Sequence, residues 1–128
     1  GIVAVLFAHD YARRQWLVVA VASVITIGAG FLLFEPQLEW YVGFSGVLHG
    51  LMAAGLVAWL RGTRDPFAWF VTALFVAKLG WEHWAGPLPF TAESLSLPVI
   101  HEAHTYGAVG GALAALWFGC RSPRPASL

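Results

Sequence analysis

A serine that lies between glycines is the feature of this sequence whose residue types could do chemistry. Ser45 belongs to the run Gly43-Phe44-Ser45-Gly46, and His49 follows it four residues later. Residues four apart on a helix share one face, so the hydroxyl and this imidazole would be neighbours. A serine hydroxyl is a weak nucleophile until a base, most often a histidine, takes its proton. The stretch therefore predicts a nucleophilic serine that needs a histidine partner.

A second histidine-rich stretch, His101-Glu102-Ala103-His104-Thr105-Tyr106-Gly107, offers that partner. We predict that His104 is the general base for Ser45, in a two-residue site without the acid that orients the histidine of a triad. Stacking or a hydrogen bond from His49 would hold the ring of His104 instead. Backbone amides at the start of a helix would bind the oxyanion. The predicted supporting residues are Gly43, Gly46 and His49.

The composition is that of a membrane protein. Of the 128 residues, 59% are hydrophobic and 11% are charged, whereas a soluble domain carries about 25% charged residues. The mean hydropathy is +0.70. The formal net charge of +0 gives no reason to expect a nucleic-acid partner. The single cysteine, Cys120, excludes an internal disulfide and a thiolate metal cluster, and we expect no metal and no cofactor.

The apolar segments predict an all-α fold, a polytopic transmembrane helix bundle. A helix needs about 20 apolar residues to cross a bilayer. We interpret residues 2–8 as the remnant of a helix that begins before this sequence, so that residues 1–120 form a partial membrane domain. Residues 121–128 are expected to be a cytoplasmic tail. The predicted spans are 15–34, 42–60, 67–85 and 99–120.

Charged residues predict the orientation of these spans. If each span crosses once, the arginines fall on one side and the glutamates on the other. The positive-inside rule makes the arginine side cytoplasmic, so Ser45 and His104 would lie at similar depth near the outer face. The arginines are Arg13, Arg14, Arg61, Arg64, Arg121 and Arg124, and the glutamates are Glu35, Glu39, Glu82, Glu93 and Glu102.

Small residues recur every four positions in the second and fourth predicted spans. Helices in lipid approach closely where small residues line the contact. Two such rows would allow Ser45 and His104 to reach hydrogen-bond distance, if these two helices pair. The rows are Gly46, Gly50 and Ala54, and Gly107, Gly111 and Ala115.

Other polar residues have simpler interpretations. Lys78 and Glu82, four residues apart in the third span, are interpreted as a structural pair, or the lysine as reaching for lipid head groups. His9, His83, His101 and Glu102 are interpreted as interface or loop residues.

The joint pattern resembles the rhomboid family of intramembrane serine proteases. The resemblance is carried by Gly43-Phe44-Ser45-Gly46 and by Ala103-His104-Thr105-Tyr106-Gly107, and it covers nearly the whole chain. More narrowly, the string from Trp40 to Gly50, the stretch from Lys78 to Glu82 and the run Tyr106-Gly107-Ala108 are similar to rhombosortases.

That resemblance implies a fold and an activity. It implies a rhomboid-like bundle with Ser45 as nucleophile, His104 as base and His49 in the place of a tyrosine that stacks on the histidine. It also implies cleavage of carboxy-terminal sorting anchors of exported proteins. Together with the orientation predicted from the charges, this places the protein in a bacterial inner membrane, with the site on the periplasmic side and the carboxy terminus cytoplasmic. The implied partners are the lipid bilayer and the transmembrane anchor of a substrate.

The sequence departs from the family in one respect and leaves two alternatives open. Rhomboids carry a histidine and an asparagine on an earlier helix that bind the oxyanion, and no such pair precedes the first span. We interpret that helix as lying before this sequence. The alternatives are an inactive rhomboid-like protein that binds helices, and a haem-binding electron carrier with two of His49, His101 and His104 as axial ligands.

Overall fold

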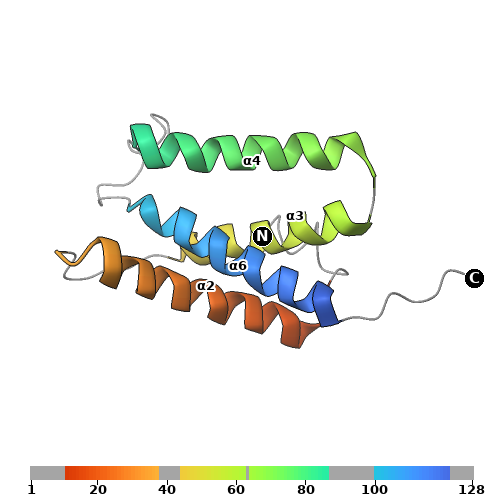
Figure 1. The fold of residues 1–128 in the computed structure, drawn as a ribbon, viewed down its shortest axis with the longest axis horizontal. Coiled ribbons are helices and arrows are strands. Elements are labelled where there is room, and N and C mark those ends of the chain that lie inside the picture. The colour runs from red at the N-terminus through yellow and green to blue at the C-terminus, as the bar shows by residue number, and fades with distance from the viewer. Residues whose placement is uncertain (1–10, 38–43, 63, 87–99, 122–128) are drawn as a thin grey trace, which may run out of the picture.

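In the computed structural model, the described residues 11–37, 44–62, 64–86 and 100–121 form four helices and no strands (Figure 1). The helices are α2 (Arg13–Phe34), α3 (Ser45–Gly62), α4 (Pro66–Ala85) and α6 (Glu102–Arg121). Each overlaps one of the predicted spans. The predicted remnant at residues 2–8 and the tail beyond Arg121 lie outside the described residues, as does Gly43.

Among the described residues, α2 alone is long and apolar enough to count by itself as a candidate membrane span. The sequence predicted four such segments. The other helices are 18 to 20 residues long, and polar side chains and glycines lower their apolar character. Among these polar side chains are Lys78 and Glu82 in α4, His49 in α3 and His104 in α6.

Helix α6 packs against α3 and α2, and α2 also contacts α3, whereas α4 contacts α3 and α6 more sparsely (Figure 1). The buried core is built mostly from small and β-branched residues. One cluster holds Val19, Ala54, Ala114 and Ala115, and a second, closer to Ser45, holds Ile27, Val47 and Ala103. Small side chains keep the three helices close together.

The two rows of small residues predicted from the sequence lie against each other. A Cβ atom added at Gly46 would lie 2.7 Å from the Ala103 carbonyl oxygen, and one at Gly50 would lie 2.6 Å from the Gly107 carbonyl oxygen. Added Cβ atoms at Gly107 and Gly111 would meet the backbones of Gly46 and Gly50. This close backbone approach sets the distance between the starts of α3 and α6.

Local sequence signals set the ends of α4. At the amino end, the Asp65 carboxylate accepts a hydrogen bond from the Phe67 amide (2.9 Å), and Pro66 occupies the first turn. At the other end, Gly86 has φ of 83°, and its amide donates to the Glu82 carbonyl (3.2 Å). A positive φ suits glycine at a helix end. Glu82 is therefore held in the last turn of α4.

Large apolar side chains cover the outside of the bundle. Leu32 is 81% exposed at the end of α2, and Trp84 is 91% exposed at the end of α4. In water such a surface would favour association with other molecules. In a bilayer it is the surface that lipid covers.

Candidate active site

Ser45 and His104 lie in hydrogen-bond contact although 59 positions separate them in the chain. Ser45 is the first residue of α3, and His104 lies in the first turn of α6. The distance from Ser45 Oγ to His104 Nε2 is 3.1 Å. The two residues predicted as nucleophile and base therefore have the geometry needed for transfer of a proton from the hydroxyl to the ring.

The second nitrogen of His104 contacts a carboxylate that the sequence interpretation had paired only with lysine. His104 Nδ1 lies 2.9 Å from Glu82 Oε2. Glu82 is 3% exposed and His104 is 7% exposed, so this contact is shielded from solvent. The three side chains come from α3, α4 and α6, and they are arranged as serine, histidine and acid.

Lys78 binds both the carboxylate and the other histidine of the cluster. Its Nζ donates to Glu82 Oε1 (2.8 Å) and to His49 Nε2 (2.9 Å). His49 Nδ1 donates to the Ser45 carbonyl oxygen (2.8 Å), since a carbonyl can only accept. His49 is therefore neutral, with a proton on Nδ1 and a lone pair on Nε2. Lys78 and Glu82 form an ion pair within the cluster.

The two histidine rings lie face to face. The ring centroids of His49 and His104 are 4.0 Å apart, with 12° between the ring planes. Phe75 of α4 also stacks on His49, at 5.9 Å and 25°. His49 thus restricts the His104 ring by stacking, one of the two ways that the sequence suggested.

Three residues of the cluster are of types that bind metal ions. One ligand atom from each of His49, Glu82 and His104 lies within 4.8 Å of the others. The lone pairs of two stacked rings lie in two nearly parallel planes, however, so they cannot both be directed at one ion between the rings. The Lys78 ammonium also donates to ligand atoms of His49 and Glu82. This arrangement suits a buried ion pair better than a chelated metal.

Parallel stacking also does not fit a haem held between His49 and His104. Axial ligands approach the iron from opposite faces, with each nitrogen directed at the metal. Here each ring covers the face of the other, and the ring nitrogens already have partners. His101, the third candidate ligand, lies 3.1 Å from the Glu102 carboxylate through its Nε2.

Helical hydrogen bonding in α3 begins close to the serine. The Leu48 amide donates to the Phe44 carbonyl (3.1 Å), so the amides before it lie in the first turn, where helices leave donors without intrahelical partners. Gly46, a predicted supporting residue, is buried in this turn. Gly43, the other glycine with that predicted role, lies outside the described residues.

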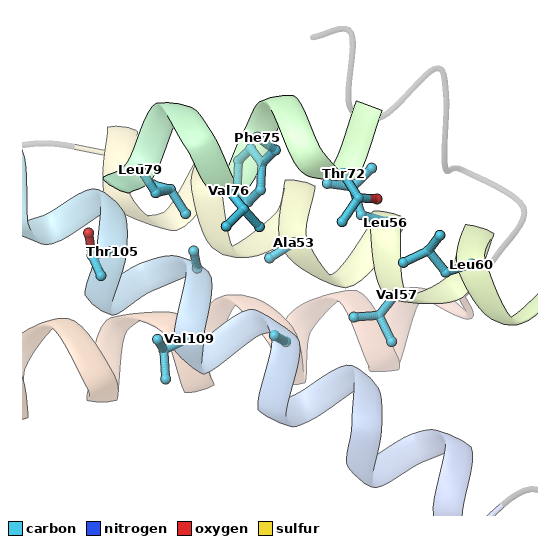
Figure 2. Close-up of a pocket in the computed structure, with 12 residues that line it drawn as sticks. Ala53, Leu56, Val57, Leu60, Thr72, Phe75, Val76, Leu79, Thr105 and Val109 are labelled. Carbon is cyan, nitrogen blue, oxygen red and sulfur yellow. The ribbon is translucent and has the colours of Figure 1, made fainter. Parts of the chain in front are cut away.

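An apolar cavity of about 240 Å³ lies beside this cluster, between α4 and the pair α3 and α6 (Figure 2). Phe75, which stacks on His49, belongs to its wall, as does Thr105, the neighbour of His104. Leu60, Leu56 and Thr72 lie at its far end from Leu79 and Thr105 in Figure 2. The cavity therefore extends from the candidate site along the inner face of α4.

Sequence reasoning left Glu82 and Lys78 out of the site. Their spacing of four correctly indicated contact with each other. A further signal was available, because the charge analysis had already assigned Glu82 to the same side as Ser45 and His104. An acid at the depth of a candidate serine and histidine is a candidate third member of a triad.

The sequence matches one known family. The family model described as Rhomboid domain matches residues 2–121. Neither the comparison with curated proteins nor the comparison with solved structures found a match.

Proposed function

The chain belongs to the rhomboid domain family, and on that premise we propose that it is an intramembrane serine endopeptidase with Ser45 as nucleophile and His104 as general base. The family consists of integral membrane proteins that are generally serine proteases. The observation that carries the proposal is the 3.1 Å contact between Ser45 Oγ and His104 Nε2. The match to the family covers both residues.

The reaction would follow the course of acyl transfer to serine. Ser45 Oγ passes its proton to His104 Nε2 and attacks the carbonyl carbon of the scissile peptide bond. The tetrahedral intermediate collapses when the carbon–nitrogen bond breaks, and His104 gives the proton to the leaving amine. Water, deprotonated by His104, then attacks the ester and releases Ser45. Backbone amides of the first turn of α3, such as that of Gly46, would stabilise the oxyanion.

The proposed substrates are membrane-anchored proteins, and specifically the carboxy-terminal sorting anchors of exported proteins. Two features support this class. The candidate site lies at one end of the bundle, where a peptide leaving the membrane would meet it. The exposed apolar surface of the helices would place the protein in the same bilayer as the anchor. The similarity of residues 40–50 and 78–82 to rhombosortases supports the narrower class.

A fluorophosphonate probe tests the activated serine directly. The full-length protein in lipid should be labelled, and Ser45→Ala and His104→Ala should each abolish labelling. A His101→Ala variant is the matched control, because this histidine lies on the same helix and pairs with Glu102 rather than with Ser45; it should be labelled as the parent is. A folded parent protein that the probe does not label would contradict the proposal and favour a helix-binding protein without protease activity.

A reporter substrate tests the reaction. It would carry a glycine- and serine-rich segment followed by an apolar helix, and it would be expressed in the same membrane. The parent should release the exported part, and Ser45→Ala should leave it anchored. Equal release by the parent and Ser45→Ala would mean that another protease cuts the reporter. If the probe labels the parent but the reporter stays intact, the proposed substrate class is wrong and the serine chemistry stands.

A further inference from the structure

Both carboxylate oxygens of Glu82 have hydrogen-bond partners, one on α4 and the other on α6. Oε1 accepts from Lys78 on its own helix, whereas Oε2 contacts His104 on α6. An ion pair that served only to neutralise two charges in α4 would need the first contact alone. The second contact joins α4 to the base of the candidate site.

The Glu82 contact decides which nitrogen of His104 carries a proton. An ionised carboxylate only accepts hydrogen bonds, so His104 Nδ1 must be the donor to Oε2. In a neutral ring the other nitrogen, Nε2, then has a free lone pair. That lone pair faces Ser45 Oγ at 3.1 Å. The carboxylate therefore selects the tautomer that can take a proton from Ser45.

Lys78 in turn fixes the position of the carboxylate. Its Nζ lies 2.8 Å from Glu82 Oε1 and 2.9 Å from His49 Nε2. An ionised carboxylate that is 3% exposed needs a compensating charge nearby to remain ionised. Lys78 supplies that charge, and its bond to His49 also holds the ring that stacks on His104.

We propose that Glu82 is a positioning residue that fixes the tautomer and orientation of His104, and that Lys78 is the positioning residue that fixes Glu82 and His49. The catalytic consequence of this arrangement depends on the proposed serine protease function. The tautomer does not depend on it, and it can be measured separately. The site then has the serine, histidine and acid of a triad, with a lysine behind the acid.

The informative variant is Glu82→Gln, because Lys78 dictates how the new amide must lie. The ammonium has only donors, so it holds the amide oxygen, and the amide NH₂ group is left facing His104 Nδ1. An NH₂ group donates, which forces the proton of His104 to Nε2. In that form the ring cannot accept the proton of Ser45. The variant has nearly the same size as the parent and keeps a hydrogen bond between positions 78 and 82.

Two readouts test the proposal on full-length protein in detergent micelles or lipid. Nitrogen NMR of ¹⁵N-histidine-labelled protein reports which nitrogen of His104 is protonated, and the signals are assigned by their loss in His104→Ala. Fluorophosphonate labelling rates report the reactivity of Ser45. We expect the parent to be protonated on Nδ1. Glu82→Gln should be protonated on Nε2 and be labelled more slowly by a factor on the order of 10² to 10⁴.

A second variant tests the part played by Lys78. In Lys78→Met combined with Glu82→Gln, nothing holds the amide oxygen, and the amide can turn to accept from His104 Nδ1. We expect the Nδ1 form to return in part and labelling to be faster than in Glu82→Gln alone. If the double variant remains protonated on Nε2, Lys78 does not orient residue 82. The double variant also has no unpaired buried charge, so it can still be measured if Glu82→Gln alone fails to fold.

The control is Glu102→Gln, which makes the same change in an acid at the start of α6 that pairs with His101. It should match the parent in both readouts. The proposal is overturned if Glu82→Gln keeps the Nδ1 form, or if it is labelled within a few-fold of the parent while Ser45→Ala is not labelled. Absence of labelling in the parent would instead overturn the protease function, while the tautomer of the parent and of Glu82→Gln would still decide the role of Glu82.

Discussion

Each side-chain nitrogen and oxygen of the cluster formed by Ser45, His49, Lys78, Glu82 and His104 has a hydrogen-bond partner. Lys78 donates to His49 and Glu82, Glu82 accepts from His104, and His49 donates to the Ser45 carbonyl. Buried polar groups are costly when a partner is missing. The arrangement therefore holds the two imidazole rings in one orientation each, which is the condition that a general base must meet before substrate arrives.

Stacking by His49 should contribute measurably to the reactivity of Ser45. His49→Phe keeps an aromatic ring against His104, whereas His49→Ala removes it. Aromatic pairs contribute about 0.5 to 1.5 kcal/mol, so we expect labelling of His49→Ala to be slower than that of His49→Phe by up to roughly tenfold. Both variants lose the contact with Lys78, so the difference between their fluorophosphonate labelling rates isolates the stacking. Equal rates in the two variants would show that stacking has no such effect.

The sequence allowed prediction that Ser45, His104 and His49 lie together, but not that Glu82 contacts His104. Ser45 and His49 are neighbours by helical spacing, and the histidine partner followed from the chemistry of serine. The contact of Glu82 with His104 depends on the rotation of α4 about its own axis relative to α6. Spacing along one helix does not determine that rotation. Only the depth of Glu82, on the same side as Ser45, was available from the charge pattern.

At the scale of the elements, the contact between α3 and α6 sets the distance between Ser45 and His104. Gly46 and Gly50 lie against the backbone of α6, and Gly107 and Gly111 lie against the backbone of α3. Repeats of small residues at intervals of four predicted two helices capable of close approach. They did not determine that these two helices pair with each other, because a small-residue row can receive any neighbour.

Gly107→Ala should separate the two helices. The added methyl group would meet the Gly46 backbone, which cannot move aside as a flexible side chain can. We expect a destabilisation of about 1 to 3 kcal/mol, measured as a lower unfolding midpoint in detergent, together with slower labelling of Ser45. The control is Gly28→Ala in α2, where an added Cβ meets nothing within 4 Å.

Alanine is favoured over glycine in a helix by about 0.5 to 1 kcal/mol, so Gly28→Ala should unfold at the same temperature as the parent or higher. If Gly107→Ala also matched or exceeded the parent, the close contact between α3 and α6 would not limit stability. Comparison of the two variants thus separates the steric effect from the helix propensity that both substitutions share.

At the scale of the whole molecule, the two ends of the bundle differ in character. One end brings together the start of α2 and the carboxy-terminal parts of α3 and α6: Tyr11 donates to the Ala54 carbonyl (3.0 Å), and Arg61 donates to the Ala115 carbonyl (3.3 Å). The opposite end holds the first turns of α3 and α6 and the last turn of α4, and with them the candidate site (Figure 1). The arginines that predicted a cytoplasmic face, such as Arg13 and Arg61, are therefore at the end away from Ser45.

The separation of the arginines from Ser45 predicts which side of the membrane the candidate site faces. In a Cys120→Ser background, Gln37→Cys places a thiol after α2 at the end that holds Ser45, and Arg64→Cys places one between α3 and α4 at the other end. Both positions are exposed. By the positive-inside rule, a membrane-impermeant maleimide should label Gln37→Cys in intact spheroplasts and Arg64→Cys only in inverted vesicles. The unsubstituted Cys120→Ser protein is the control for background labelling.

The maleimide labelling tests the proposed substrate class as well as the orientation of the protein in the membrane. Exported proteins present their anchors to the periplasmic side, so a peptidase that cuts them needs Ser45 near that face. Labelling of Arg64→Cys in spheroplasts, with Gln37→Cys protected, would place Ser45 at the cytoplasmic face. The chemistry of Ser45, His104 and Glu82 would be unaffected by that outcome, because it depends on contacts within the bundle. The proposed cleavage of exported sorting anchors would then be wrong, and the substrates would have to present their cleavage sites from the cytoplasm.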